Sequence, residues 1–308
     1  MSVPLHAERS ALTEAQKAAF LVLLADEDPH VASAIRDRFL QTSLADSAWL
    51  TPHMRSSDPV LRRRSSEIIG ELSKRAADRR FLAFCQHQAE GVPLEEAGSI
   101  GTSRGRFADA DRLEEGLWLL AATRYPFINA EGYTALLDDY AREARALLPS
   151  DHEGFKPLAI LNEILFKKHG YRGNEKNYYD AENSFLNRVL DRKTGNPISL
   201  CVLYFLVARR IGIPIIGIGM PGHFVCRYQT ASEEIYVDCF NQGKLLTKAD
   251  CVRFLNQTSV GFQEGFLAAS SPRQILLRIC TNLHQIYAQE GQSAENASMQ
   301  RYILALAK

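Results

Sequence analysis

The residues with the clearest chemical potential lie between positions 217 and 240. Gly217, Gly219 and Gly222 have the G-x-G-x-x-G spacing of a dinucleotide-binding loop, and Asp238 follows about where such folds place a ribose-binding carboxylate. That loop works only when its last glycine opens a helix, because the helix N-terminus binds the pyrophosphate. Here the strand-like sequence HFVCRYQ follows instead. We therefore expect no nicotinamide or flavin, and we predict no other cofactor.

His223 and Asp238 are predicted to face each other across a β-hairpin. If the chain turns near Thr230 and Ala231, the two residues lie directly opposite each other, with Cβ atoms within about 5.5 Å. A carboxylate at that distance fixes the tautomer of an imidazole and raises its basicity. The pair is therefore a candidate general base, although a structural ion pair beside a turn has the same signature.

A candidate nucleophile precedes this pair in the chain. The sequence NPISLCVLYFLVARR predicts a helix with Pro197 in its first turn, which places Ser199 and Cys201 near the helix N-terminus. Such a position favours a thiolate over a thiol, so Cys201 is able to complete a Cys-His-Asp arrangement. Ser199 is a second candidate, which needs stronger activation by a base. Cys201 also lies in an apolar run, where cysteine is commonly a small buried hydrophobe.

Residues 1–98 are predicted to be helical. The first helix begins at Thr13, whose hydroxyl can cap it while Gln16 reaches back. Asp-Pro pairs at positions 28 and 58 then start two further helices, since Asp caps a helix and Pro suits its first turn. The region is either a short HEAT-like repeat or an irregular bundle. The stretch from 98 to 112, with its glycine and polar residues, is predicted to be a loop and a domain boundary.

Residues 112–271 are predicted to form a second domain, of mixed structure. Helical patterns run to about Ile211, and three strand-like segments follow, IPIIGIG, HFVCRYQ and EEIYVDCF, which short turns join into an antiparallel sheet. Residues 272–308 are helical again and have the length of one tetratricopeptide-like hairpin. The expected fold class is therefore α+β, with a helical N-terminal region, a small antiparallel sheet and a C-terminal helical hairpin.

Bulk properties restrict the compartment and the partners. Lys and Arg total 36, as do Asp and Glu, so no net field attracts nucleic acid or an anionic membrane. The most apolar run, 198–208, is well short of the roughly 20 residues of a membrane span, and the N-terminus has no apolar export segment. We expect a cytoplasmic protein. Its six cysteines lack metal-ligand spacing, which predicts reduced thiols and no metal site.

Four motifs in fixed order resemble a known family. The series GNPISL, ARRIGIP, GMPGHF and VDCFNQG resembles the SirB-type branch of the transglutaminase-like superfamily, and the similar region runs from about residue 112 to 290. The resemblance implies a papain-like core in which a nucleophile at a helix start meets a His and an Asp on successive strands. It also implies tetratricopeptide-like C-terminal helices and a regulatory role.

The resemblance carries over to the site residues only in part. His223 and Asp238 occupy the positions of the superfamily's catalytic His and Asp. The expected cysteine position, counted back from the GIP sequence, holds Pro197, as the SirB-type branch generally does. Cys201, one helical turn later, and Ser199 are then the remaining nucleophile candidates.

Two functions therefore remain open. In the first, which we favour because the expected nucleophile is missing, the domain is a degenerate-site regulator or scaffold that binds a protein or peptide partner. In the second, Cys201 or Ser199 attacks an amide or ester carbonyl, His223 transfers the proton and Asp238 orients His223. The protein would then be a hydrolase or an acyltransferase.

Three further residues are predicted to contact a substrate. Asn183 offers an amide donor to an oxyanion, although an asparagine before a helix is commonly a cap. Arg227 shares a strand face with His223 and is able to bind a substrate carboxylate, although it also suits an exposed strand. Tyr179 is placed to rim a cleft.

Overall fold

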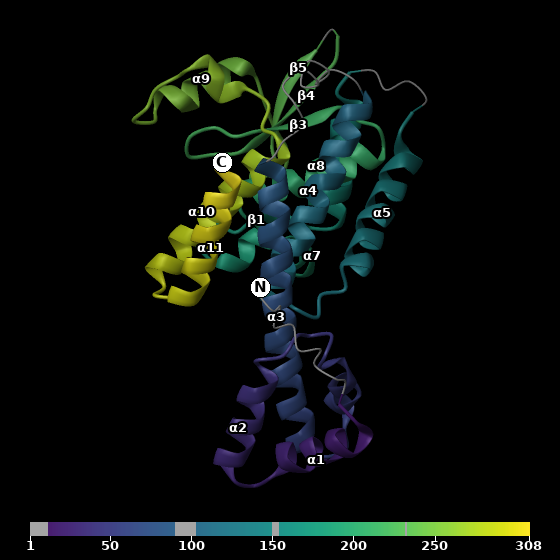
Figure 1. The fold of residues 1–308 in the computed structure, drawn as a ribbon. Coiled ribbons are helices and arrows are strands. Elements are labelled where there is room, and N and C mark those ends of the chain that lie inside the picture. Colours follow the sequence, from purple (N-terminus) through teal and green to yellow (C-terminus); the bar gives the residue numbers. More distant parts are fainter. Residues whose placement is uncertain (1–11, 90–102, 150–153, 232) are drawn as a thin grey trace, which may run out of the picture. The chain divides into compact units, whose positions relative to one another are not determined.

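The computed structural model describes residues 12–89, 103–149, 154–231 and 233–308 (Figure 1). Contacts within the chain divide it into two units. The first comprises Met1–Ala77 with Arg124–Phe127, and the second comprises Asp78–Thr123 with Ile128–Lys308. Every candidate site residue belongs to the second unit.

The first unit is helical, as its sequence predicts. It contains α1 (Glu14–Ala25), α2 (Pro29–Phe39), the 3-10 helix η1 (Ala48–Arg55) and the beginning of α3 (Pro59–Ala89). Apolar side chains of all four elements form its core. These include Leu24, Phe39, Leu50, Ile68 and Leu72.

The predicted helix starts of this unit are confirmed by their caps. Thr13 and Gln16 form a reciprocal capping box at the start of α1. Asp28 accepts a hydrogen bond from the His30 amide at 2.8 Å, and Asp58 accepts one from the amide of residue 60. Each cap satisfies an amide that the helix itself leaves without a partner.

Residues 103–112 are helical, so the predicted loop over 98–112 is wrong for this part. They belong to α4 (Ser103–Arg124), while 98–102 lie outside the described residues. A single glycine costs a helix interior only about 1 kcal/mol relative to alanine. The sequence after Gly105 is rich in Ala, Leu, Glu and Arg, which are good helix formers and outweigh that cost.

The second unit is built around one buried helix, α8 (Pro197–Arg210). Its residues from Pro197 to Ala208 are buried with the exception of Phe205, which is half-buried. A helix that is apolar on every side must be covered on every side. The elements that contact α8 include α5 (Ala130–Leu147), α7 (Leu186–Arg192) and the strands that follow it. In Figure 1, α8 accordingly lies among other elements of this unit.

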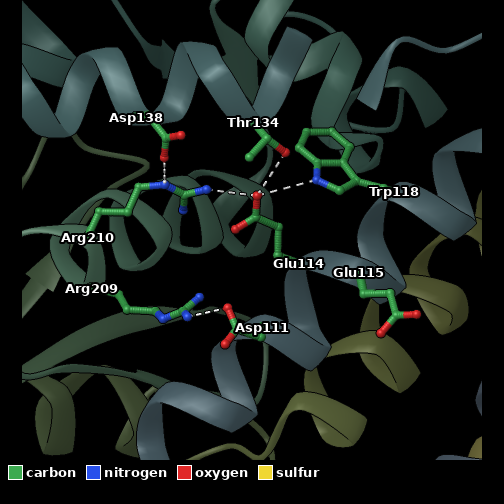
Figure 2. A pocket seen from close by; sticks show the side chains of 8 residues that line it. All are labelled: Asp111, Glu114, Glu115, Trp118, Thr134, Asp138, Arg209 and Arg210. Atoms are coloured by element: carbon green, nitrogen blue, oxygen red, sulfur yellow. Dashed lines mark hydrogen bonds and ion pairs between the residues drawn. The ribbon is translucent and has the colours of Figure 1, made fainter. Parts of the chain in front are cut away.

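Ion pairs hold the C-terminal end of α8 (Figure 2). Arg210 lies between Glu114 of α4 and Asp138 of α5, with N–O distances of 2.8 and 2.6 Å, and Arg209 pairs with Asp111. Glu114 is only 8% exposed, so it depends on its partner, because an uncompensated buried charge costs several kcal/mol. The cluster therefore anchors the helix whose opposite end carries the candidate nucleophiles.

The sheet confirms the predicted α+β class. Three of its four strands were expected, and the order along the sheet follows the order along the chain. The antiparallel strands are β3 (Ile215–Ile218), β4 (Val225–Gln229), β5 (Glu234–Asp238) and β6 (Lys244–Leu246). A separate parallel pair is formed by β1 (Arg172–Gly173) and β2 (Thr194–Gly195).

The register of the central hairpin differs from the predicted one. Cys226 pairs with Val237, so the turn is centred one residue later than expected. The reason is a hydrogen bond of 2.9 Å from the Thr230 amide to the Glu233 carbonyl, which closes the loop beyond the predicted turn. His223 therefore lies diagonally across from Asp238 and not directly opposite it.

Several shorter elements and the C-terminal helices complete the second unit. The predicted C-terminal helical pair is confirmed as α10 (Pro272–Gln289) and α11 (Ser293–Leu306), which pack against each other, while their tetratricopeptide-like character stays a prediction. Among the described residues, no helix combines the length and apolar character needed to cross a membrane. The remaining elements are α6 (Lys156–Asn162), the π-helical η3 (Glu163–Lys168), η4 (Ala181–Ser184), α9 (Lys248–Asn256) and η5 (Glu264–Leu267).

Candidate functional site around His223 and Asp238

His223 and Asp238 are hydrogen-bonded, as the sequence predicts. His223 Nε2 lies 3.0 Å from Asp238 Oδ2, and the two side chains are 14% and 7% exposed. Asn241 supports the carboxylate, because its Nδ2 donates to Oδ2 at 2.7 Å and its backbone amide donates to Oδ1 at 3.2 Å. Burial opposes ionisation of Asp238, but the hydrogen bonds from His223 and Asn241 outweigh it and hold the pKa of Asp238 below its ordinary value.

The backbone before β4 directs the His223 ring. Gly222 has a φ of +76°, a conformation that favours glycine, and the His223 amide donates to the Met220 carbonyl at 3.2 Å. The ring also packs against Phe254, with centroids 5.6 Å apart. Nε2 is committed to Asp238, whereas Nδ1 has no hydrogen-bond partner in the parts of the chain that the structure describes. Nδ1 is therefore the nitrogen available to another group.

His223 lines a cleft of about 660 Å³. Three segments surround it together with the His223 turn: the start of α8, the tyrosine pair Tyr178 and Tyr179, and one face of α10. Its lining combines apolar side chains, neutral polar side chains and one arginine, as small-molecule and peptide sites commonly do. The α10 residues that line it include Gln274, Leu277, Arg278, Thr281, Asn282 and Gln285.

Residue 197, the position at which the family resemblance expects a nucleophile, faces this cleft together with His223. It is Pro197, the first residue of α8, and it has no nucleophilic atom. Ser199 lies in the same helical turn but is buried and does not line the cleft. Its hydroxyl is engaged with Asn196 in a capping box, accepting from the amide and donating to the carbonyl, each at 3.1 Å.

Cys201 is also buried and does not line the cleft. Its thiol donates to the Phe224 carbonyl at 3.4 Å, on the side of α8 that faces β4. Burial raises the pKa of Cys201 well above its ordinary value, which is opposite to the effect expected at an exposed helix N-terminus. The structure therefore places the thiol in the core, outside the lining of the cleft to which His223 belongs.

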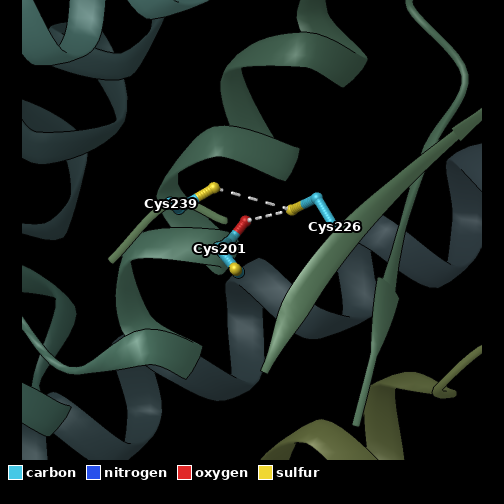
Figure 3. Close-up of side chains that lie close together, drawn as sticks. All are labelled: Cys201, Cys226 and Cys239. Atoms are coloured by element: carbon cyan, nitrogen blue, oxygen red, sulfur yellow. Dashed lines mark hydrogen bonds between the residues drawn. The ribbon is translucent and has the colours of Figure 1, made fainter. Parts of the chain in front are cut away.

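Three cysteines converge around this position, although their sequence spacing gives no sign of it (Figure 3). The sulfur atoms of Cys201, Cys226 and Cys239 all lie within 4.8 Å of one another. Cys239 donates to Cys226 Sγ, and Cys226 donates to the Cys201 carbonyl. Three thiolates at this spacing suit a soft cation, but each residue is buried and already hydrogen-bonded as a thiol. We interpret the cluster as packed core thiols.

The three predicted substrate contacts are placed differently. Tyr179 is 67% exposed and lines the cleft. Asn183 is buried and does not line it; its side-chain amide donates to the carbonyls of residues 177 and 178 and thereby holds the tyrosine loop. Arg227 is not a lining residue either, since its guanidinium lies 3.6 Å from Glu234 and donates to the Leu267 carbonyl.

Arg278 is a lining residue that sequence reasoning missed. It lies on α10, and its guanidinium donates to the His223 carbonyl at 3.2 Å. The two residues are 55 positions apart in the chain, and Arg278 is surrounded in the sequence by the ordinary amphipathic pattern of a helix. No local signal distinguishes it from a surface arginine.

Comparison with known proteins identifies the family of the domain that contains these residues. Residues 131–281 match the family model described as the transglutaminase-like superfamily, and this range contains His223, Asp238 and Pro197. The chain therefore carries a transglutaminase-like domain. The SirB-type branch is compatible with this match but is not named by it.

Several curated proteins are similar to this chain. A UPF0162 protein of Xylella fastidiosa (strain Temecula1) is 37% identical over 177 residues, which cover 55% of this chain and 63% of the relative. F-box only protein 21 of Mus musculus is 32% identical over 142 residues, which cover 44% of this chain and 22% of the relative. The chain thus spans less than two thirds of either relative. No solved structure matches the chain significantly.

The hydrogen bonds to Asp238 should make the stability of the transglutaminase-like domain sensitive to acid. The folded pKa of Asp238 lies below the unfolded value, so its contribution is present above about pH 4 and is lost as the pH falls through the folded pKa. We expect Asp238→Asn to lower the loss of unfolding free energy between about pH 7 and about pH 3 by roughly 1 kcal/mol, because a single carboxyl with an unfolded pKa of about 3.9 can contribute no more than this above pH 3. Urea unfolding at both pH values measures this, with the exposed Asp37→Asn as control. Equal pH dependence in all three proteins would contradict the prediction.

Proposed function

We propose that the transglutaminase-like domain binds a segment of a protein partner in the His223 cleft without forming a covalent bond to it. The observation that carries the proposal is Pro197. It stands at the start of α8 and lines the cleft with His223, where covalent chemistry of the superfamily type needs a nucleophile. A fold can keep its cleft as a binding site after the chemistry is gone.

The positions of the other nucleophile candidates support a binding role. Ser199 is used to cap α8, and Cys201 is buried with its thiol bonded to the Phe224 carbonyl. Either residue would have to break these hydrogen bonds and leave the core to reach a substrate in the cleft. Such a change would cost the free energy of these hydrogen bonds and of burial in the core.

The context of the domain is part of the same proposal. We infer a cytoplasmic regulator of the SirB type whose partner is a protein or peptide and not nucleic acid or a membrane. The equal totals of basic and acidic residues, 36 each, support this choice because no net field attracts a polyanion. The similar region in F-box only protein 21 covers only 22% of that protein, which favours a module that works within different chains.

The His223–Asp238 pair favours a second candidate function. A carboxylate-oriented imidazole that lines a cleft with Nδ1 unengaged is suited to accept a proton. With Cys201 or Ser199 moved into the cleft, the domain would act as a hydrolase or acyltransferase on amide or ester bonds. This function requires a rearrangement at the start of α8, which the binding function does not.

Peptide binding to the full chain tests the proposal. Peptides are first selected from a displayed library of random sequences, and the affinity of a labelled selected peptide is then measured by fluorescence anisotropy. We expect Gln285→Trp, which fills the cleft from α10, to weaken binding at least about tenfold, because a bulky side chain excludes the peptide from its pocket. His223→Ala should change the affinity by no more than about threefold, since in this function the imidazole is not a reacting group.

Two observations complete the test. Gln257→Trp places the same bulky residue outside the cleft lining, at the C-cap of α9, and should bind like the wild type. The peptide should also be recovered intact by mass spectrometry. Hydrolysis or transfer that the wild type performs and His223→Ala does not would establish the enzymatic alternative. Binding that is indifferent to Gln285→Trp would show that the cleft is not the binding site.

A further inference from the structure

The cleft contains a cationic side chain without an acidic partner. Arg278 is half-buried, and among the described residues no Asp or Glu lies within ion-pair distance of it. Arg210 and Arg227 are also shielded from water, but each pairs with a carboxylate of its own unit. A charge that is withdrawn from water is costly unless a counter-charge is present at least part of the time.

The lining of the cleft provides no counter-charge. No Asp or Glu belongs to its described lining, whose polar members besides Arg278 are amides, hydroxyls and the His223 imidazole. Burial lowers the pKa of Arg278, an effect that the nearby Tyr178 opposes only in part. An incoming anion therefore contacts no carboxylate of the lining, and it removes the cost of the unpaired guanidinium.

Arg278 is held in place and keeps donors to spare. Its Nη2 donates to the His223 carbonyl at 3.2 Å, which ties the guanidinium to the turn that carries the imidazole. A guanidinium has five N–H donors in a planar fork, and this contact uses one. The remaining donors match the two oxygens of a carboxylate, which arginine binds in a bidentate manner.

The start of α8 adds to the positive potential. Asn196, Pro197 and Ile198 line the cleft, and a helix N-terminus carries the equivalent of about half a positive charge. The helix is long enough to have this effect, since α8 contains 14 residues. The side chain of Arg278 and the N-terminus of α8 thus favour an anion in the same cleft, although they come from elements far apart in the chain.

We propose that Arg278 is the specificity-determining residue of the cleft and binds a carboxylate of the partner segment. The carboxylate comes from an Asp or Glu side chain or from the C-terminus of the partner. This inference rests on the proposed binding function, and it replaces Arg227, the residue that the sequence suggested for a substrate carboxylate. Arg227 has its own partner in Glu234 and lies outside the cleft lining.

The experiment uses the full chain and two synthetic libraries of short random peptides, one with free C-termini and one with amidated C-termini. Bound peptides are sequenced by mass spectrometry for the wild type, Arg278→Gln, Arg278→Lys and Arg253→Gln. Arg253 is 71% exposed on α9, so its substitution makes the same change of net charge outside the cleft. Thermal unfolding of each variant checks that it is folded.

We expect the wild type and Arg253→Gln to select acidic residues over their amides, or free over amidated C-termini. Which of the two preferences appears identifies the source of the carboxylate. A selected peptide should lose at least about tenfold in affinity with Arg278→Gln, which removes the charge. Arg278→Lys should also bind more weakly than the wild type, because a lysine lacks the bidentate fork.

Two other results would each overturn the inference. Wild-type binding with no preference for acidic residues or free C-termini would contradict the role of Arg278 and leave the binding function intact. This outcome needs no variant, so it holds even if Arg278→Gln does not fold. Absence of any peptide binding by the wild type would remove the proposed function together with the inference.

Discussion

Pro197→Cys is expected to produce a cysteine that iodoacetamide alkylates in the native protein at least about a hundred times faster than Cys201, because residue 197, although largely buried, borders the cleft, whereas Cys201 lies in the core. Residue 197 lines the cleft with His223 and is the first residue of α8. A helix N-terminus and a nearby imidazole both favour the thiolate, which is the reactive form. The exchange should be tolerated, since the amide that replaces the proline nitrogen stands where a helix leaves its amides unpaired.

The pH dependence of alkylation, followed by peptide mass spectrometry, separates the effect of the thiol pKa on the rate from the effect of accessibility. In Pro197→Cys the midpoint for residue 197 should lie well below the ordinary cysteine pKa of about 8.5. Adding His223→Ala should move the midpoint back toward that value, while the accessibility of the thiol stays the same. An unchanged midpoint would mean that residue 197 and His223 do not interact, and the proline would then explain nothing about the loss of chemistry.

The native Cys201 serves as an internal reference in the same experiment. It is buried, with its pKa raised by burial, so it should resist alkylation until the protein is unfolded. If Cys201 instead reacts in the folded wild type and loses this reactivity with His223→Ala, the two residues form an activated pair. The hydrolase or acyltransferase function would then replace the binding function that we propose.

Gly243→Ala is expected to destabilise the protein by about 3 kcal/mol, combining roughly 1–2 for a left-handed backbone and 1–3 for overpacking. Gly243 has a φ of +78°, and a Cβ atom there would overlap the side chain of Asn162. Asn162 cannot simply withdraw, because its Nδ2 donates to the Gly243 carbonyl at 2.9 Å. The Gly243 amide in turn donates to the Asp238 carbonyl at 2.9 Å, so the substitution also strains the turn that follows Asp238.

Gly261→Ala is the matched control for this prediction. Gly261 has a similar φ of +68°, but no atom lies within 4 Å of the position that a Cβ would take. Gly261→Ala should therefore lower the free energy of unfolding only by the backbone contribution, about 1 kcal/mol. Urea unfolding of both variants measures the difference. Equal losses would show that the contact with Asn162 has no energetic weight and that only the backbone conformation matters.

Short-range features of this protein were readable from the sequence. The caps at Thr13 and Asp28 were predicted correctly, because a cap involves only residues two or three positions apart. The contact of His223 with Asp238 was also predicted, since the two are 15 residues apart and lie just before one strand of a hairpin and at the end of the other. The register of that hairpin was wrong, because it depends on the hydrogen bonds of one turn, for which the sequence has several solutions.

Only the tertiary structure decided what surrounds the pair. Cys201 had the sequence of a helix-start nucleophile, but the packing of α8 against β4 buries its thiol with those of Cys226 and Cys239. Arg278 had no distinguishing sequence signal, yet α10 brings it to the His223 carbonyl from 55 residues away. Patterns along the chain report which face of an element is apolar, whereas the identity of its neighbours depends on how distant elements pack. The sequence by itself therefore determined the paired imidazole, and the fold determined that it shares a cleft with a proline and an unpaired arginine.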